Sequence, residues 1–376
     1  MIPLAIPHLS GNELEYVKEC INTNWLCEGR FLKKFEEKVK DYTNIKNCIP
    51  CSNGTAALHI SLIVTGVKSN EEVIVPTVTF IAPINTLRYI GAYPVFMDCD
   101  NHYNIDVKKL QDFLETECEI KNGFTYNKKS GRKISAIIPV HIFGNSADMD
   151  PINKLSKEYN IKIIEDASES IGTRYKDKHT GGLSDIGCFS FNANKIVTSA
   201  GGGMILTNND DLAKQSRYLI SQAKEDGVHY MHHNIGYNYR LSNVHAAIGL
   251  AQFENIDKSI QIKINNYNKY KEQLSNIKKI KLVDSPSYSK SNHWFYTLQL
   301  DSEKSKNEII EKMNNNKIQV RPIWYLNHLQ KPYVNFQNYK IENAIDLWKR
   351  SVNIPCSIDI TDDQISQVVD IIKQYY

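Results

Sequence analysis

The spacing of hydrophobic residues changes along the chain and divides it into two parts. From residue 46 to about residue 210, short β-rich hydrophobic runs alternate with longer amphipathic stretches. The runs predict strands at residues 73–75, 95–96, 136–140, 161–164, 188–191 and 204–207. Helices are predicted at residues 107–114 and 152–159, the second with Asp150 as N-cap and Pro151 at its first position. This alternation is typical of βαβ units around a parallel or mixed sheet buried on both faces.

The second part begins after Gly236 and has a different pattern of hydrophobic and polar residues. Its hydrophobic spacing predicts a long helix at residues 241–274, a strand at 293–300, a helix at 306–313 and a strand at 318–321. A closing helix is predicted after Thr361. We therefore expect a large α/β domain at residues 1–240, including an N-terminal segment, and a smaller α+β domain at residues 241–376.

Composition and charge exclude several classes of protein. Of the 376 residues, 41% are hydrophobic and 23% are charged, which excludes a disordered chain, a coiled coil and collagen. Lys and Arg number 45 against 42 Asp and Glu, so no basic surface for nucleic acid or anionic lipid is expected. The longest apolar stretch, at residues 134–144, is too short to span a bilayer. The N-terminus lacks signal-peptide features, and these points predict a soluble cytoplasmic protein.

The eight cysteines are scattered, which is a poor framework for disulfides. Cys48 and Cys51 form a C-x-x-C motif, but a zinc site needs a second such pair or clustered histidines. A redox role needs the motif to open a helix, whereas a Ser-Asn-Gly turn follows it here. We predict two ordinary thiols on a short strand, and no metal site.

Two segments at predicted strand ends carry groups suited to chemistry. Residues 52–58 form a small-residue turn that opens a helix, and Gly54 and Thr55 in it suit a phosphate, although an ordinary N-cap turn has the same sequence. Residues 165–169 bring Asp166, Glu169 and a third carboxylate to the end of a strand. These carboxylates could bind a metal, act as acid and base, or pair with a cationic ring nitrogen. The alternative is a solvated acidic helix start.

A third segment contains Ser190 and Lys195, followed by three consecutive glycines at residues 201–203. Most lysines are solvated surface residues, but a desolvated amine just past a buried strand readily forms a Schiff base. The sequence holds no G-x-G-x-x-G, no P-loop lysine motif and no G-x-S-x-G. The dinucleotide-binding, P-loop and hydrolase interpretations therefore have no supporting motif.

Taken in order, the three segments resemble the fold-type I pyridoxal-phosphate enzymes (aspartate aminotransferase-like transferases), and within them the DegT/DnrJ family of nucleotide-sugar aminotransferases. The resemblance covers nearly the whole chain and includes residues 11–13, 25, 35–36, 76–80, 236–240, 321–324 and 354–357. Within the family, residues 125–129, 139–145 and 201–203 are most similar to the branch that makes 4-amino-4,6-dideoxy-N-acetylglucosamine nucleotides for legionaminic acid and bacillosamine.

The resemblance implies a role for each matching residue around pyridoxal 5′-phosphate. Lys195 would hold the cofactor covalently and move protons as the catalytic residue, and a lysine here distinguishes aminotransferases from the relatives that dehydrate sugars. Asp166 would keep the pyridine nitrogen protonated, so that the ring acts as an electron sink. Gly54, Thr55 and Ser190 would bind its phosphate.

Further roles follow from the same resemblance. Phe80 would stack on the cofactor ring, and Glu169 would lie near the ring hydroxyl, at a position often filled by glutamine. Asn238 would reach the phosphate in the neighbouring subunit, so a homodimer with shared active sites is expected. Ala193 and Ala200 stand where close relatives often have glycine, and we expect them to tune the loop without abolishing chemistry.

The implied reaction is a transamination in which L-glutamate supplies the amine to C4 of a nucleotide-linked 4-keto-6-deoxy-N-acetylhexosamine, with UDP favoured over GDP as the carrier. A GDP-perosamine-type aminotransferase and a non-catalytic relative of the fold are the alternatives. Candidate contacts to the sugar nucleotide are aromatic and basic residues, each of which could equally be packing or surface: Trp25, Arg321, Trp324 and His328.

Overall fold

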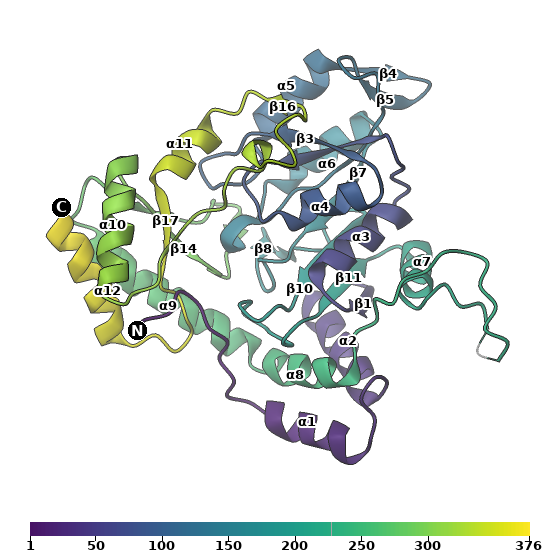
Figure 1. Cartoon of the computed structure of the whole chain (residues 1–376), viewed down its shortest axis with the longest axis horizontal. Coiled ribbons are helices and arrows are strands. Elements are labelled where there is room, and N and C mark those ends of the chain that lie inside the picture. The colour runs from purple at the N-terminus through teal and green to yellow at the C-terminus, as the bar shows by residue number, and fades with distance from the viewer. Residues whose placement is uncertain (227) are drawn as a thin grey trace.

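A mixed eight-stranded sheet forms the centre of the computed structural model, which describes residues 1–226 and 228–376 (Figure 1). Its strand order is β1-β11-β10-β7-β6-β2-β3-β16, and only β11 runs antiparallel to its neighbours. The strands are β1 Asn47–Cys51, β2 Glu72–Pro76, β3 Tyr93–Met97, β6 Ile134–Ile137, β7 Lys162–Asp166, β10 Ile186–Ser190, β11 Gly203–Thr207 and β16 Asn338–Tyr339. The predicted strands of the first part are thus confirmed, with small shifts at their ends.

Helices bury both faces of this sheet. One face packs against α5 and α6, and the other packs against α3 and α4. In β2, Ile74 belongs to the first core and Val73 and Val75 belong to the second, as the alternation of side chains along a strand requires. The helices of this part are α1 Glu13–Asn22, α2 Arg30–Thr43, α3 Gly54–Val64, α4 Ala82–Tyr89, α5 Val107–Glu117, α6 Met149–Glu158, α7 Asp210–Ile220 and α8 Asn243–Phe253.

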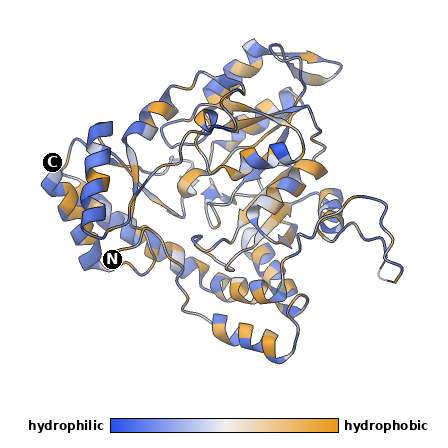
Figure 2. Ribbon diagram, in the orientation of Figure 1, coloured by the Kyte–Doolittle hydropathy of each residue, from blue (hydrophilic) through white to orange (hydrophobic). Residues whose placement is uncertain are grey.

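The C-terminal part is built on a second sheet of order β12-β14-β17-β15. Its elements are α9 Ile256–Leu274, β12 Lys281–Leu282, β14 Tyr296–Gln299, α10 Glu303–Asn315, β15 Arg321–Pro322, α11 Asn343–Arg350, β17 Ser351–Ile354 and α12 Asp362–Tyr375. The helices here mix hydrophobic and hydrophilic residues, as expected where one side faces the core (Figure 2). This part also supplies β16 to the edge of the large sheet. The domain boundary at residue 240 stays a prediction.

Small elements complete the described chain. The hairpin of β4 Cys118–Lys121 and β5 Phe124–Asn127 projects from the large sheet, and a three-stranded sheet joins β8 Arg174–Tyr175, β9 Lys178–His179 and β13 Ser289–Lys290. Two short 3₁₀ turns lie at η1 Ile142–Gly144 and η2 Asn327–Leu329. Over residues 1–226 and 228–376, no helix is long and apolar enough to cross a membrane.

The single helix predicted at residues 241–274 was wrong, because α8 and α9 are separate helices. The break falls at Glu254 and Asn255, where the Asn255 amide donates to the Gln252 carbonyl (3.1 Å) three residues back instead of four. α8 is buried over most of its surface, whereas α9 buries one side only, so hydrophobic spacing alone did not show the break.

Other predicted ends also moved. α6 begins at Met149 with Asp148 as N-cap, so Asp150 is not the cap and Pro151 lies at the third helical position. Proline fits there because the first four helical N–H groups have no acceptor within the helix. The strand predicted at residues 318–321 is reduced to β15, and Ile318 pairs with Ile2 in an isolated bridge.

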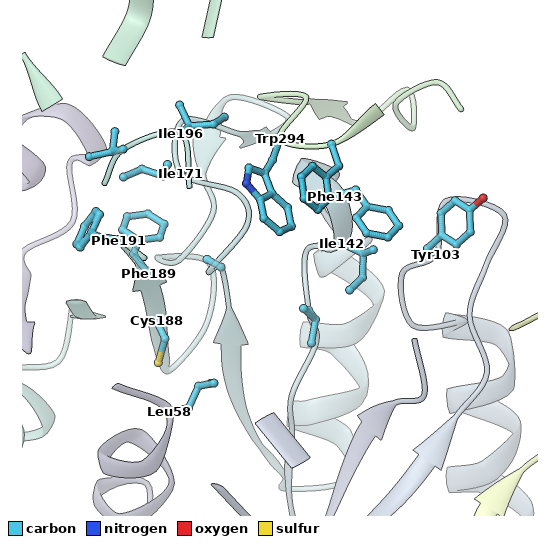
Figure 3. Packing of buried hydrophobic residues seen from close by; sticks show 14 of the residues in the cluster. Leu58, Tyr103, Ile142, Phe143, Ile171, Cys188, Phe189, Phe191, Ile196 and Trp294 are labelled. Atoms are coloured by element: carbon cyan, nitrogen blue, oxygen red, sulfur yellow. The ribbon is translucent and has the colours of Figure 1, made fainter. Parts of the chain in front are cut away.

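The two parts of the chain are joined by hydrogen bonds around Asn292. Its side-chain amide donates to the carbonyls of Glu169 (3.0 Å) and Ile171 (2.9 Å), and its Oδ1 accepts from the Trp294 amide (2.9 Å). Gly144 lies directly beside this side chain, with a φ of +94°. The arrangement fixes Trp294 in the buried cluster near Phe143 (Figure 3).

We expect Gly144→Ala to destabilise the protein by roughly 2–5 kcal/mol. A residue with a β-carbon is strained in this left-handed backbone conformation, and the added methyl group would also overpack the site. That carbon would lie 2.0 Å from Asn292 Oδ1. Gly131→Ala is the matched control, since Gly131 also has a positive φ (+69°) but no atom within 4 Å of an added β-carbon. Gly131→Ala should lower the free energy of unfolding by about 1–2 kcal/mol. Urea unfolding checks both values, and equal losses would contradict the role of Gly144.

Candidate active site

A cavity of about 350 Å³ opens beside the carboxyl ends of β7 and β10 and the N-terminus of α3. Ligands of open α/β sheets bind at this edge. The cavity brings together nine of the residues singled out from the sequence: Gly54, Thr55, Phe80, Asp166, Glu169, Ser190, Lys195, Arg321 and Trp324. Residues from all three chemical segments and from the C-terminal part therefore line one cavity.

The N-terminus of α3 forms the floor of the cavity. The Asn53 side chain caps the helix by accepting from the Ala56 amide (2.8 Å), so the turn at residues 52–58 does contain an ordinary N-cap. A β-carbon on Gly54 would lie 2.9 Å from Ser190 Cβ and 3.3 Å from the Ser168 hydroxyl. Glycine is therefore needed for the close approach of this helix end to the two serines. Helical N–H groups and hydroxyls in this arrangement suit a phosphate.

Two carboxylates face the cavity from the end of β7 and the loop after it. Asp166 is buried and its Oδ1 accepts from the Ser168 amide (3.1 Å), while Glu169 Oε2 accepts from the Phe143 amide (2.7 Å). Burial raises the pKa of Asp166 and raises the pKa of Glu169 to about 7. These groups do not form the solvated helix start that was the alternative, because no helix follows β7 directly.

The third carboxylate of this segment has a different environment. Glu165 is fully buried and accepts from the amides of Gly181 (2.7 Å) and Leu183 (2.6 Å), the Ser184 hydroxyl (3.0 Å) and His141 Nε2 (3.0 Å). Each of its two carboxylate oxygens thus accepts two hydrogen bonds. Glu165 fastens the loop before β10 to β7 and does not line the cavity.

Lys195 lies in a turn just after β10, and its side chain reaches the same cavity. Burial lowers the pKa of its amine, and the nearby charges of Glu169 and Asp166 oppose that shift. The Nζ atom is 3.8 Å from the ring centroid of Trp294. A partly desolvated amine beside two carboxylates can act as a nucleophile and move protons.

Aromatic side chains form the opposite wall. Phe80 and Trp324 meet edge to face with centroids 5.5 Å apart, and Trp324 lies nearly parallel to Trp294. Arg321, from β15, is exposed at the mouth of the cavity. Sequence reasoning missed Trp294, because nothing in the residues around it distinguishes this tryptophan from a core residue of the strand predicted at residues 293–300.

Three predicted site residues lie outside this cavity. Asn238 lines a separate hollow with Arg240, Trp25 is exposed near α2, and His328 is buried and bonded to the Thr77 hydroxyl (2.7 Å). Cys48 and Cys51 lie on β1 as free buried thiols, as predicted. Across residues 1–226 and 228–376, no three His, Cys, Asp or Glu side chains are grouped to hold a metal ion.

Residues 7–373 match the DegT/DnrJ/EryC1/StrS aminotransferase family. The chain is 35% identical to the GDP-perosamine synthase of Caulobacter vibrioides over 99% of its length and 98% of that protein. It is 30% identical to the UDP-4-amino-4,6-dideoxy-N-acetyl-β-L-altrosamine transaminase of Campylobacter jejuni, covering 95% and 92%. The PLP-form structure of the putative sugar aminotransferase Spr1654 from Streptococcus pneumoniae matches with a TM-score of 0.89 at 21% identity, covering 100% and 98%.

The fold and the cavity define a fold-type I pyridoxal-phosphate enzyme. This chain belongs to the DegT/DnrJ/EryC1/StrS aminotransferase family. It is a sugar aminotransferase that depends on pyridoxal phosphate, and its family implies a nucleotide sugar and an amino donor as substrates. The fold class, the family and the cofactor predicted from the sequence are thereby confirmed.

The residues around the cavity fit this cofactor. We propose that the α3 N-terminus holds its phosphate through Gly54 and Thr55, with Ser190 completing the cradle, since a β-carbon at Gly54 would fill the space. Asp166 would then face the ring nitrogen, and Lys195 would supply the amine that binds the cofactor covalently. When bound, the cofactor supplies an electron sink for a carbanion.

We expect Gly54→Ala to weaken binding of pyridoxal phosphate by about 10- to 100-fold, a loss of about 1.4–2.8 kcal/mol, because its methyl group narrows the cradle. Gly201→Ala is the control, since the nearest atom to its added β-carbon is 3.9 Å away. Fluorescence titration with the cofactor measures both affinities. Wild-type affinity of Gly54→Ala for the cofactor would contradict a phosphate site at the N-terminus of α3.

The raised pKa of Glu169 has a consequence for stability. A carboxyl whose pKa is about 7 when folded and 4.5 as a reference holds its proton more tightly in the folded state, so stability falls as the pH rises between these values. Glu169→Gln should remove the contribution of this carboxyl to the pH-dependent loss of stability. Glu158→Gln, at an exposed site, should leave the pH dependence of stability unchanged. Urea unfolding of cofactor-free protein at pH of about 5 and 7.5 tests this. Parallel profiles for wild type and Glu169→Gln would contradict it.

Proposed function

We propose that this enzyme transfers an amino group from L-glutamate to C4 of a nucleotide-linked 4-keto-6-deoxyhexose, as in the biosynthesis of bacterial surface sugars. The observation that carries the proposal is the Lys195 amine, held with Asp166 and Glu169 in one cavity beside the phosphate cradle. Membership of a sugar aminotransferase family supports the substrate class.

The side chains divide the work of this reaction. Lys195 Nζ takes the proton from Cα of the amino donor and later returns a proton to C4 of the sugar, a role typically worth about 10²–10⁴-fold in rate. Asp166 keeps the proton on the ring nitrogen by its negative charge. Trp324 and Arg321 lie at the open side of the cavity and offer a stacking surface and a positive charge to the sugar nucleotide.

A 2-acetamido-2,6-dideoxy-4-keto sugar on UDP is our first candidate substrate. Its support is the resemblance of three sequence segments to the legionaminic acid and bacillosamine branch, together with the 30% identity to a transaminase whose name includes a UDP-linked N-acetyl sugar. The segment at residues 125–129 lies on and after β5, where the Thr125 hydroxyl donates to the Tyr159 carbonyl (2.5 Å) inside the fold. The Thr125 hydroxyl is thus occupied inside the fold, and residues 125–129 do not line the cavity.

GDP-4-keto-6-deoxymannose is the second candidate. It is favoured by the 35% identity, over nearly the whole chain, to a protein named GDP-perosamine synthase. The two candidates differ at C2, which carries an acetamido group in the first and a hydroxyl in the second. They also differ in the nucleotide, which is UDP in the first candidate and GDP in the second.

We also propose a homodimer with shared active sites. Asn238 lies outside the cavity of its own chain, between α7 and α8, and the chain that follows α7 projects away from the rest of the molecule (Figure 1). Tyr230, Met231 and Ile235 on the same segment are all at least half exposed, with Ile235 at 84%. Large apolar side chains gathered on a surface mark an interaction site. A second copy of the chain would cover them and receive Asn238.

The function is tested by offering the cofactor-loaded enzyme L-glutamate and a panel of 4-keto-6-deoxy sugar nucleotides, with mass spectrometry of the products. We expect amination of a UDP-linked 2-acetamido sugar, and none by Lys195→Ala, which lacks the amine that moves the protons. Efficient amination of GDP-4-keto-6-deoxymannose with no reaction of any 2-acetamido sugar would replace the first candidate by the second. No amination of any sugar would favour a non-catalytic relative.

The shared site is tested by mixing inactive subunits. Lys195→Ala and Asn238→Asp should together recover up to about a quarter of wild-type activity, because half of the dimers are hybrids with one intact site. Lys195→Ala mixed with Asp166→Asn is the control and should recover nothing, since both residues belong to the same chain's half of the site. Equal results from the two mixtures, once subunit exchange is demonstrated, would contradict a shared site.

A further inference from the structure

Trp294 makes two separate contacts with the turn that carries Lys195. Its ring face lies against the Lys195 Nζ, with 3.8 Å from that atom to the ring centroid. Its Nε1–H donates to the carbonyl of Asn194 (2.8 Å), the residue just before the lysine. One side chain from the C-terminal part thus holds both the end of the lysine and the backbone from which the lysine projects.

The indole itself is held rigidly. It is 2% exposed, its ring stacks on Phe295 with centroids 4.0 Å apart, and its backbone amide donates to Asn292 Oδ1 (2.9 Å). Asn292 in turn donates to the carbonyl of Glu169. The indole is therefore tied to the same loop that carries a carboxylate of the site, so its position relative to Lys195 is set by the fold.

We propose that Trp294 is a positioning residue for Lys195: its ring face receives Nζ whenever the lysine carries a free amine, and its N–H fixes the turn through Asn194. This inference rests on the proposed function, in which that amine moves protons during part of the reaction. The indole keeps a long, flexible side chain close to the reacting atoms instead of letting it sample the cavity.

Charged groups around Lys195 act together with the ring. Asp166 and Glu169 face the amine from β7 and its following loop, and Arg321 lines the cavity from β15. The two carboxylates and the electron-rich face of the indole favour the protonated amine, whereas burial opposes it. Removing the ring face therefore lowers the pKa of the Lys195 amine.

The test measures the amine directly, in protein reconstituted with pyridoxamine phosphate, where Lys195 is free. Trace acylation across a pH series, followed by mass spectrometry of the Lys195 peptide, gives the pH midpoint, and exposed Lys33 serves as internal standard. Trp294→Met fills the space without a ring face, and we expect a midpoint about 0.5–1.5 pH units below wild type. Trp294→Phe keeps a ring face and should shift by less than half as much.

Two further measurements separate the contacts. Phe124→Leu removes a ring from a different lysine, Lys133, whose Nζ lies 4.7 Å from the Phe124 ring centroid, so its Lys195 midpoint should equal wild type. Trp294→Phe loses the bond to Asn194, and hydrogen exchange at residues 192–197 should be at least about threefold faster. An unchanged Lys195 midpoint in Trp294→Met, or unchanged exchange in Trp294→Phe, would overturn the proposal. Neither readout depends on which sugar is aminated.

Discussion

Burial of charge around Lys195 is the constraint on which the other features of the site depend. Asp166 and Glu169 share the cavity with this amine, and burial raises the pKa of both carboxyls and lowers that of the amine. A buried charge without partners is strongly unfavourable. The fold therefore supplies a backbone donor to each carboxylate, from Ser168 and Phe143.

These donors come from loops that are themselves held by side chains. The Phe143 amide belongs to η1, where Phe143 and Gly144 both have positive φ values, of 55° and 94°. Glycine adopts such a φ freely, but the Phe143 backbone is strained and persists only where surrounding contacts determine it. The Gly144 carbonyl accepts from the hydroxyls of Thr173 and Ser291 (2.8 Å each), which supplies those contacts. Strain in one short turn thus serves the electrostatics of the cavity.

The cavity has two ends with different origins. Its floor and its charged groups come from segments that follow β1, β7 and β10, so the cofactor end is encoded by short stretches of sequence. Its open side includes Arg321 and Trp324 from the C-terminal part. The enzyme class was therefore readable from local motifs. The sugar depends on side chains that several distant segments bring to the open side, and the motifs do not describe that arrangement.

The sequence by itself determined the alternation of strands and helices, the turn at residues 52–58 that opens a helix and the segment that contains Lys195, because each depends on neighbours within a few residues. Only the tertiary structure decided the antiparallel direction of β11, the break between α8 and α9, and the placement of Trp294 over a lysine about 100 residues away. It also separated Glu165 from Asp166. Adjacent side chains of a strand point to opposite faces, so one fastens a loop and the other faces the cavity.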